Sequence, residues 1–415
     1  MAIVRPFAGI RPIPHLAHQI ACLPYDVMNR EEAKGMAQNN PYSFLHVTRA
    51  EIDLDDSADP YDDATYQKSR KNLEQMIQKG ILIQDPKPFY YIYRQVMNGR
   101  MQTGIVGCTS IDEYINDKIK KHELTRHEKE LDRIKHFDYT NANTEPVFLT
   151  YRADQEINEI LENWTASHQP VYHFTSSDEI THILWIVDDE KTIQLIGEMF
   201  LKINHLYIAD GHHRAASAVK VGLKRREQNP HYTGDEEFNY FLSVLFPDHQ
   251  LHIMEYNRVV ADLNGLTKDQ FLSKVNEKFD IEICNPNIPF QPTQRHTFGM
   301  FLEGKWYQLT AKEGTFDPSN LIEQLDVSIL QNNLLGPILN IQDPRTDRRI
   351  DFIGGIRGLS ELEKRASQDM KIGFSLFPIT IDELMRIADE GKIMPPKSTW
   401  FEPKLRSGLF VHSLE

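Results

Sequence analysis

The pattern of apolar and polar residues predicts a chain in which helices alternate with short strands and hairpins. Apolar runs of four to eight residues bounded by turn residues indicate strands, and longer stretches of helix-forming residues indicate helices. Because hairpins are mixed with helices, we expect an α+β fold with mixed sheets. The expected helices are 29–38, 61–79, 154–166, 190–203, 215–228, 268–279, 321–333, 360–367 and 380–390; the expected strands include 43–47, 147–151, 181–187, 206–209, 350–353 and 371–377.

Turn residues and helix caps sharpen several of these predictions. Asn98-Gly99 predicts a hairpin that joins strands 89–96 and 101–108. A second hairpin is expected between 238–246 and 251–259, and a third around Glu303-Gly304. Asn29 and Glu32 have the spacing of a capping box, as do Thr125 and Glu128, so each pair predicts a helix start.

The length of the chain predicts more than one domain. At 415 residues the chain is too long for a single ordinary core. We expect a first domain over 1–260 and a second α+β domain over 261–415, with the tail 394–404 returning to the functional site.

Composition and charge restrict the class of protein. Hydrophobic residues make up 40% and charged residues 26%, which is typical of a globular chain, and no apolar run reaches the length of a membrane span. Three separated cysteines without a CxxC and an N-terminus without a signal-peptide core favour a cytoplasmic protein. The net charge of −14 disfavours nucleic acid as a partner. The oligomeric state stays open, a homo-oligomer included.

The segment 206–218 is the strongest candidate for chemistry. A short buried strand is followed by Asp210, Gly211, His212, His213 and Arg214, and then by an alanine-rich helix. The first amides of a helix have no intrahelical partner and favour anions, most often phosphate. Glycine allows close approach of the backbone, arginine offers a planar fork for phosphate oxygens, and Asp210 could accept a proton or hold a divalent cation. The same residues also fit an ordinary turn with a solvated helix start.

Two further polar clusters add candidates. The first contains His122 and Glu123 on a loop before the helix start at Thr125. The second is the proline-rich tail, where Lys397, Ser398 and Thr399 could hold phosphate or carboxylate oxygens. A solvated helix face and an ordinary loop are the respective alternatives.

These segments together resemble a bacterial and archaeal family first catalogued as domain of unknown function 1015. The resemblance rests on Pro24-Tyr25-Asp26-Val27, Ser43 to Val47, Arg49 with Glu51 to Asp53, His122-Glu123 with Thr125, Asp132-Arg133, Glu145-Pro146, Asp210 to Arg214, and Pro396 to Thr399. The turn from Gly211 to Arg214 is also similar to the nucleotide-binding motif of the ParB/sulfiredoxin superfamily. More loosely, it is similar to that of free-serine kinases.

The resemblance implies a compact nucleotide-binding core and phosphoryl transfer from ADP or ATP, with Mg²⁺, to the hydroxyl of L-serine. It implies that Gly211, His212, His213 and Arg214 hold the nucleotide phosphates. Asp210, with Asp26 or Glu51, would supply the base and the Mg²⁺ ligands. It further implies substrate or supporting roles for His122, Glu123, Thr125, Arg133, Lys397, Ser398 and Thr399.

Three functions therefore compete. The first is a small-molecule kinase with a nucleotide and a hydroxyl substrate as its partners. The second is a metal-dependent hydrolase, for which histidines and acids are present but no HExxH spacing joins them. The third is a nucleotide-binding regulator without turnover.

Overall fold

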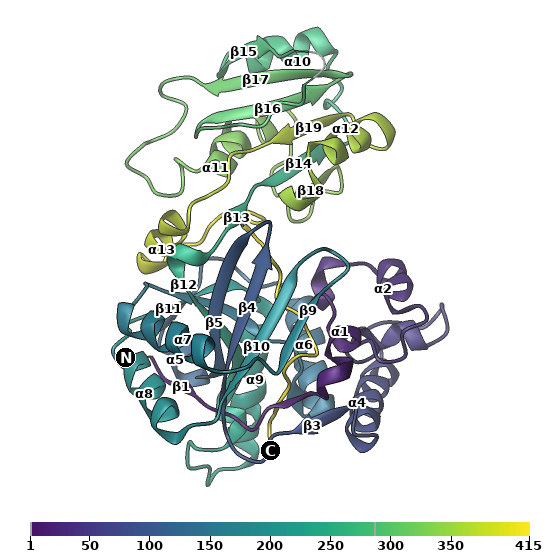
Figure 1. The fold of residues 1–415 in the computed structure, drawn as a ribbon. Coiled ribbons are helices and arrows are strands. Elements are labelled where there is room, and N and C mark those ends of the chain that lie inside the picture. The colour runs from purple at the N-terminus through teal and green to yellow at the C-terminus, as the bar shows by residue number, and fades with distance from the viewer. Residues whose placement is uncertain (1, 286–287) are drawn as a thin grey trace. The chain divides into compact units, whose positions relative to one another are not determined.

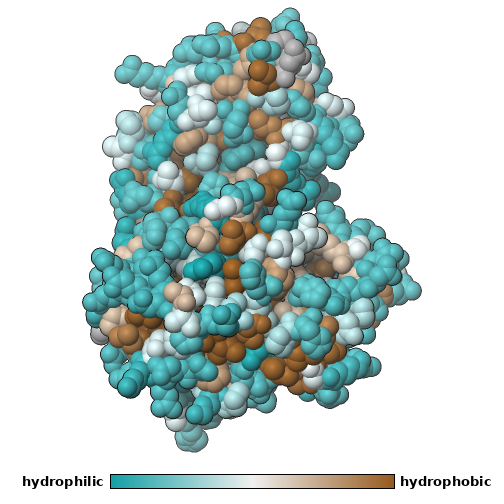
Figure 2. All heavy atoms as spheres, in the orientation of Figure 1, coloured by the Kyte–Doolittle hydropathy of each residue, from teal (hydrophilic) through white to brown (hydrophobic). Residues whose placement is uncertain are grey.

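The chain is divided into two compact units. A computed structural model describes residues 2–285 and 288–415. The first unit contains Met1–Lys121, Thr125–Leu251 and Pro403–Glu415, and the second contains His122–Leu124 and His252–Glu402. Within the described residues, no helix combines the length and the apolar character needed to cross a membrane. Hydrophilic side chains cover most of the face drawn in Figure 2.

A nine-stranded mixed sheet forms the centre of the first unit (Figure 1). Its order is β6-β11-β8-β12-β5-β4-β10-β9, and β1 pairs with β5. β11 runs parallel to β6 and β12 parallel to β8, whereas the other pairs are antiparallel, which confirms the predicted mixed sheet. The strands are β1 (Val4–Arg5), β4 (Tyr90–Met97), β5 (Arg100–Ser110), β6 (Ile119–Lys120), β8 (Val147–Tyr151), β9 (Tyr172–Thr175), β10 (Thr181–Val187), β11 (Leu206–Asp210) and β12 (Tyr240–Pro247).

Helices and two small sheets complete the first unit. α9 packs against α6 and against strands β8 and β12. β2 (Ile10–Pro12) pairs with β3 (Leu82–Gln84), and β7 (Ala142–Asn143) pairs with β21 (His412–Ser413) near the C-terminus. The helices are α1 (Ala17–Ile20), α2 (Arg30–Ala37), α3 (Leu45–Thr48), α4 (Asp63–Gln78), α5 (Ile111–Ile115), α6 (His127–Thr140), α7 (Gln155–Ser167), α8 (Glu190–Phe200) and α9 (His212–Gln228), with 3-10 turns at Pro14–Leu16, Tyr25–Val27 (η2), Ala50–Asp53 (η3), Glu237–Asn239 and Asp248–Gln250.

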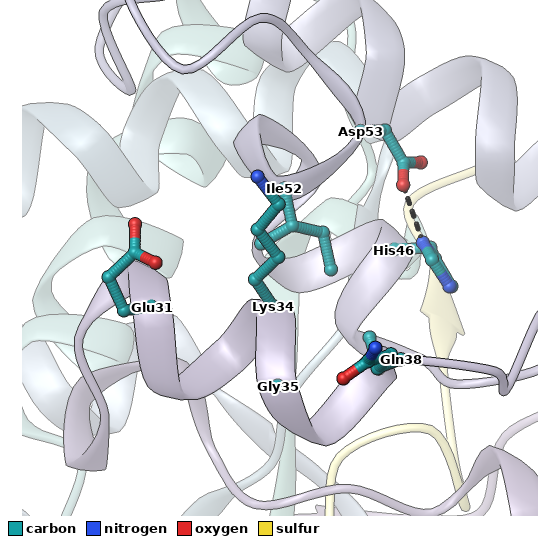
Figure 3. Close-up of a pocket in the computed structure, with 8 residues that line it drawn as sticks. Glu31, Lys34, Gly35, Gln38, His46, Ile52 and Asp53 are labelled. Atoms are coloured by element: carbon teal, nitrogen blue, oxygen red, sulfur yellow. Dashed lines mark hydrogen bonds and ion pairs between the residues drawn. The ribbon is translucent and has the colours of Figure 1, made fainter.

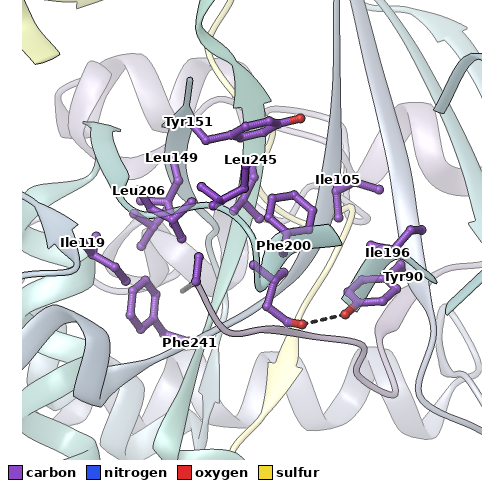
Figure 4. Close-up of a cluster of buried hydrophobic side chains, with 14 of the residues drawn as sticks. Tyr90, Ile105, Ile119, Leu149, Tyr151, Ile196, Phe200, Leu206, Phe241 and Leu245 are labelled. Atoms are coloured by element: carbon purple, nitrogen blue, oxygen red, sulfur yellow. Dashed lines mark hydrogen bonds between the residues drawn. The ribbon is translucent and has the colours of Figure 1, made fainter. Parts of the chain in front are cut away.

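The main core lies between this sheet and its helices. The central strands β5, β8, β11 and β12 are buried along almost their whole length, as expected for strands that are covered on both faces. Tyr90 also donates a hydrogen bond from its hydroxyl to the Val4 carbonyl at 2.6 Å (Figure 4). The cluster includes Ile105, Ile119, Leu149, Tyr151, Ile196, Phe200, Leu206, Phe241 and Leu245.

The second unit contains a six-stranded antiparallel sheet of order β15-β17-β16-β19-β14-β18. The predicted hairpin at Glu303-Gly304 joins β16 and β17, and both turn residues have positive φ. The strands are β13 (Ile253–Met254), β14 (Tyr256–Val260), β15 (Phe279–Ile283), β16 (Thr297–Leu302), β17 (Lys305–Ala311), β18 (Ile350–Gly354), β19 (Ile372–Ser375) and β20 (Trp400–Phe401); the helices are α10 (Lys268–Val275), α11 (Asp326–Leu330), a π-helix Gln331–Leu335, a 3-10 turn Gly355–Arg357, α12 (Leu359–Gln368) and α13 (Ile381–Asp389).

Three local predictions are wrong. The segment predicted as a strand over 43–47 instead forms the helix α3, because packing of Phe44, Leu45 and Val47 into one core overrides their β propensity. Strand 251–259 does not form a hairpin with 238–246: β12 pairs with β5 and β8, whereas β14 belongs to the sheet of the second unit.

The third error concerns the start of α6. The helix begins at His127, with Arg126 as an N-cap residue that forms no side-chain cap. The Thr125 hydroxyl bonds to the Glu130 carboxylate, which is also paired with Lys220 on α9. This competing carboxylate explains why Thr125 and Glu128 do not form the predicted capping box.

Candidate functional site

The turn between β11 and α9 is built by a β-bulge followed by a left-handed glycine. Ile208 lies opposite Leu149 and Asp210 lies opposite Phe148, so one extra residue is inserted on β11 before Asp210. Such a bulge changes the direction of the side chain that follows it. Gly211 has φ 95° and serves as the N-cap of α9 without a side-chain cap. The Gly211 amide donates to Asp210 Oδ1 at 3.0 Å.

Arg214 is folded back over this turn. Its side chain is 2% exposed, one Nη donates to the Pro146 carbonyl, and the other lies 3.6 Å from Asp210 Oδ2. Arg214 Nε is buried without a hydrogen-bond partner within the described residues. A Cβ on Gly211 would lie 2.9 Å from this Nε, so a larger residue at 211 would displace the guanidinium. One donor of the guanidinium is therefore buried beside the turn without an acceptor within the described residues.

Lys404, from the C-terminal segment, is the closest cation to Asp210. Its Nζ lies 3.0 Å from Asp210 Oδ2, with side-chain exposures of 9% for Lys404 and 26% for Asp210. Gln95 donates to the Lys404 carbonyl at 2.8 Å and thereby fixes the segment. Although burial alone would raise the pKa of Asp210, Lys404 and then Arg214 hold that pKa well below its usual range. Asp210 is therefore ionised at neutral pH and is a weak proton acceptor.

A buried network connects this turn to the region around Tyr25. The guanidinium of Arg133 lies 3.8 Å from the centre of the Tyr25 ring, and its Nε donates to Asp132 Oδ2 at 3.0 Å. Glu145 accepts from the Tyr25 amide at 3.0 Å, from the Ser407 hydroxyl at 2.8 Å and from Arg133 at 3.4 Å. Burial raises the pKa of Glu145, while Arg133 and Arg214 oppose that rise. Glu145 thus fixes the turn η2 and the C-terminal segment at one place.

The structure distinguishes the two early acids. Asp26 is exposed on η2. Burial alone would lower the pKa of Arg214, but the carboxylates of Asp26, Asp210 and Glu145 raise it. Asp26 therefore lies close enough to act on the same guanidinium. Glu51 has a side chain only 5% exposed, and its Oε1 accepts from Arg49 Nε at 2.6 Å. Arg49 also donates to the carbonyls of Tyr25 and Met28, so the Arg49–Glu51 pair supports the turn that carries Asp26.

The two histidines of the turn occupy different surroundings. His212 is 5% exposed, and its proximity is a further influence that lowers the pKa of Asp210. His213 Nε2 accepts the Arg126 amide at 2.9 Å, which leaves Nδ1 as the nitrogen that carries the proton. His213 therefore ties the start of α9 to the segment before α6, where Thr125 also lies.

The remaining predicted residues belong to the second unit. The His122 carbonyl accepts the Met394 amide at 2.9 Å, and Glu123 is half-buried. Ser398 donates from its hydroxyl to the Pro395 carbonyl at 2.6 Å, and Lys397 has φ 56°. The first unit thus brings together Asp26, Arg133 and the turn 210–214, with Glu51 and Thr125 in supporting contacts, while His122, Glu123, Lys397, Ser398 and Thr399 lie in the second.

Sequence reasoning missed two members of this site, Glu145 and Lys404. Glu145 lies in a segment that carried the family resemblance and Lys404 at the end of the tail 394–404, but their spacing of 65 and 194 residues from Asp210 gives no local signal of contact.

A hollow elsewhere on the first unit contains none of the predicted site residues. It has a volume of about 470 Å³ and lies beside α2 and α3 (Figure 3). His46 Nδ1 and Asp53 Oδ1 are 2.7 Å apart at its edge, and the hydrogen bond that the imidazole donates to Asp53 raises the pKa of His46. The other lining residues include Glu31, Lys34, Gly35, Gln38 and Ile52.

Comparison with known proteins places the chain in a family. A family model described as "Protein of unknown function (DUF1015)" matches residues 4–328. No curated protein matches the sequence. The fold is similar to a conserved hypothetical protein from Pyrococcus furiosus, with 13% identity, a TM-score of 0.37, and coverage of 74% of this chain and 95% of the other. A free serine kinase in complex with AMP is 15% identical, with a TM-score of 0.37 and coverage of 74% of this chain and 91% of the other. SbnI from Staphylococcus aureus, with a C-terminal truncation, is 11% identical, with a TM-score of 0.38 and coverage of 74% of this chain and 87% of the other.

Proposed function

The chain belongs to the DUF1015 family of proteins of unknown function, and on that premise we propose that it is a small-molecule kinase. It transfers a phosphoryl group from ADP or ATP to a hydroxyl acceptor, with L-serine as the leading acceptor and O-phosphoserine as the product. The reaction class comes from the similarity of the turn 210–214 to that of free-serine kinases. The observation that carries the proposal is the convergence of Asp26, Asp210, Arg214 and Lys404 beside the uncapped start of α9.

The helix start supplies the phosphate grip. α9 is 17 residues long and presents its first-turn amides without a side-chain cap, so the positive end of its dipole faces the turn. The free Nε of Arg214 and the ammonium of Lys404 add two cations beside it. Such fixed positive groups stabilise the charge on the oxygens of a transferring phosphoryl group.

Asp26 is the proton acceptor in this proposal. In the transfer step the acceptor hydroxyl oxygen forms a bond to the terminal phosphorus, while the bond from that phosphorus to the bridging oxygen of the nucleotide breaks. The hydroxyl proton passes to the Asp26 carboxylate, and AMP or ADP leaves. Asp210 is less suited to this task because Lys404 and Arg214 hold its pKa low. Glu51 is less suited because it is buried and paired with Arg49.

Asp210 and Asp26 also fit the requirements of Mg²⁺. This ion is usually held by one or two carboxylates together with phosphate oxygens and water. Asp210 presents a partly exposed carboxylate, and Asp26 an exposed one. Bound Mg²⁺ would neutralise charge on the nucleotide phosphates. Arg133, which is 5% exposed and paired with Asp132 and Glu145, acts in this scheme by positioning Tyr25 and Asp26 rather than by binding the acceptor.

The test is direct formation of phosphoserine. The full chain is incubated with L-serine, Mg²⁺ and either ADP or ATP, and the product is detected by ³¹P NMR. We expect O-phosphoserine from the wild type and from the control Asp188→Asn, and none from Asp210→Asn. Asp188 is an exposed acid that forms no ion pair within the described residues. Absence of product with both donors, across related hydroxy-amino acids, would refute the kinase. Tight nucleotide binding without transfer would identify a regulator instead.

A further inference from the structure

The sheet of the second unit contains a buried arginine that has no counter-ion among the described residues. Arg258 lies on β14, opposite Phe352 of β18 and Phe374 of β19, and is 4% exposed. Its guanidinium lies 5.4 Å from the centre of the Phe352 ring. A buried charge is normally paired, because removal from water without a partner carries a large free-energy cost.

The partners of this guanidinium are all backbone carbonyls. One Nη donates to the Tyr256 carbonyl and the other to the Lys397 carbonyl at 3.0 Å. No carboxylate forms an ion pair with Arg258 within residues 2–285 and 288–415. An arginine has five N–H donors, so most of those of Arg258 have no acceptor in the part of the chain that the structure describes. Consistent with this, burial lowers the pKa of Arg258 to about 10, and Tyr256 is the neighbour that opposes the shift.

A second cation lies on the loop that Arg258 holds. Lys397 is exposed, its Nζ is 5.5 Å from the centre of the Tyr256 ring, and its own carbonyl is the one bound by Arg258. Lys397 has φ 56°, an uncommon conformation for a residue with a side chain. The ring of Tyr256 also packs edge-on against Phe352 and Trp400. Both cations are thus positioned around one aromatic cluster.

We propose that Arg258 and Lys397 form an oxyanion-binding site within the second unit, which takes the carboxylate or phosphate group of a small molecule. The guanidinium offers a planar fork to two oxygens and the flexible ammonium closes over the anion from the exposed side. This inference goes beyond the proposed kinase reaction and does not depend on it. The carbonyl contacts orient the guanidinium but carry no net charge. The bound anion supplies the negative charge that balances the guanidinium.

The test measures anion binding by the full chain. Inorganic phosphate and acetate are titrated separately by calorimetry into the wild type, Lys397→Gln, Arg258→Lys and Lys305→Gln. Lys305 is an exposed lysine of the same sheet and forms no ion pair within the described residues, so it serves as the matched control. We expect Lys305→Gln to match the wild type, Lys397→Gln to bind about 10-fold more weakly, and Arg258→Lys about 100-fold more weakly. The two titrants tell which oxyanion is preferred.

Equal binding by Lys397→Gln and Lys305→Gln, or no saturable binding of either anion, would overturn the site. If Arg258→Lys does not fold, the comparison of the two surface lysines still decides. Phosphate can also bind at the turn 210–214, so the titrations are repeated with Arg214→Lys. A loss confined to that variant would support the kinase site and refute the one proposed here, whereas a loss confined to Lys397→Gln would do the reverse.

Discussion

The two units treat buried positive charge in opposite ways. In the first unit, Arg133 is paired with Asp132 and Glu145, and Arg214 is under the influence of Asp26, Asp210 and Glu145. In the second unit, the polar partners of the buried Arg258 within the described residues are backbone carbonyls, and its guanidinium lies over an aromatic ring. The first arrangement balances the positive charge with carboxylates of the same unit, whereas the second leaves a positive charge that a bound anion would balance.

This difference predicts how each region responds to a ligand. A nucleotide phosphate that enters the first unit competes with the Asp210 carboxylate for the cations that already face it. We therefore expect Lys404 to move from Asp210 to the phosphate. An anion entering the second unit only adds a partner. Binding at the first site is therefore expected to need a cation that takes over Asp210, whereas binding at the second is not.

Neutralising Asp210 is expected to have the largest effect. Asp210→Asn removes the charge that pairs with Lys404 and that, in the proposed reaction, would bind Mg²⁺, so we expect kcat for phosphoryl transfer to fall about 10³-fold. Steady-state kinetics with Asp188→Asn as the control measures this. A variant that retains wild-type kcat would remove Asp210 from the site.

The two early acids are expected to separate activity from stability. Asp26→Asn should lower kcat about 10²-fold with an unchanged Tm, because Asp26 is exposed and, in the proposed reaction, accepts the hydroxyl proton. Glu51→Gln should instead lower Tm, because it breaks the buried pair with Arg49. Kinetics and thermal denaturation of both variants are compared. The reverse pattern would make Glu51 the base.

Removing Lys404 should lower the free energy of unfolding, because the Asp210 carboxylate then loses the cation that pairs with it. We expect Lys404→Met to lose about 2 kcal/mol of the free energy of unfolding at pH 7. The pKa of Asp210 is lower in the folded chain than in the unfolded chain, so this contribution is complete above the unfolded value of about 4 and disappears as pH falls further. Urea denaturation at pH 7 and in the acid range measures the difference between the two proteins. A difference that grows towards acid pH would contradict the assignment.

The smallest effect is expected at a second unpaired charge of the second unit. Asp326 accepts the His296 amide through Oδ1 at 2.9 Å, Oδ2 has no hydrogen-bond partner within the described residues, and burial raises the pKa of Asp326 to about 7. Its folded pKa lies above the unfolded value, so the wild type loses stability as pH rises from about 4 to 7.

Asp326→Asn is therefore expected to be about 1 kcal/mol more stable than the wild type above pH 7 and equal to it near pH 4. Thermal denaturation across this range provides the measurement. A variant with the same advantage at both ends would show that the carboxyl does not titrate there.

Much of the fold could be predicted because local signals agreed with tertiary packing. The capping box of Asn29 and Glu32 and the turn Asn98-Gly99 both form as expected. The segment 43–47 shows the limit, since three apolar residues among five fit a strand or a short buried helix equally well, and only the surrounding core decides.

The site was predictable only where its residues are consecutive. Asp210 to Arg214 could be read as a turn before a helix, because a strand and a helix flank it directly. The pairing of Asp210 with Lys404 depends on a C-terminal segment that returns to the first unit, and the choice of Asp26 over Glu51 depends on Arg49, whose contacts no local pattern reveals.

The most direct test is an experimental structure of the full chain with ADP and Mg²⁺. We predict that the terminal phosphate lies on the amides of Gly211 to Arg214, with Arg214 Nε bound to a phosphate oxygen and Lys404 moved from Asp210 to the phosphate. Phosphates bound elsewhere, with the Gly211 amide still on Asp210 and Lys404 still paired with it, would contradict the account.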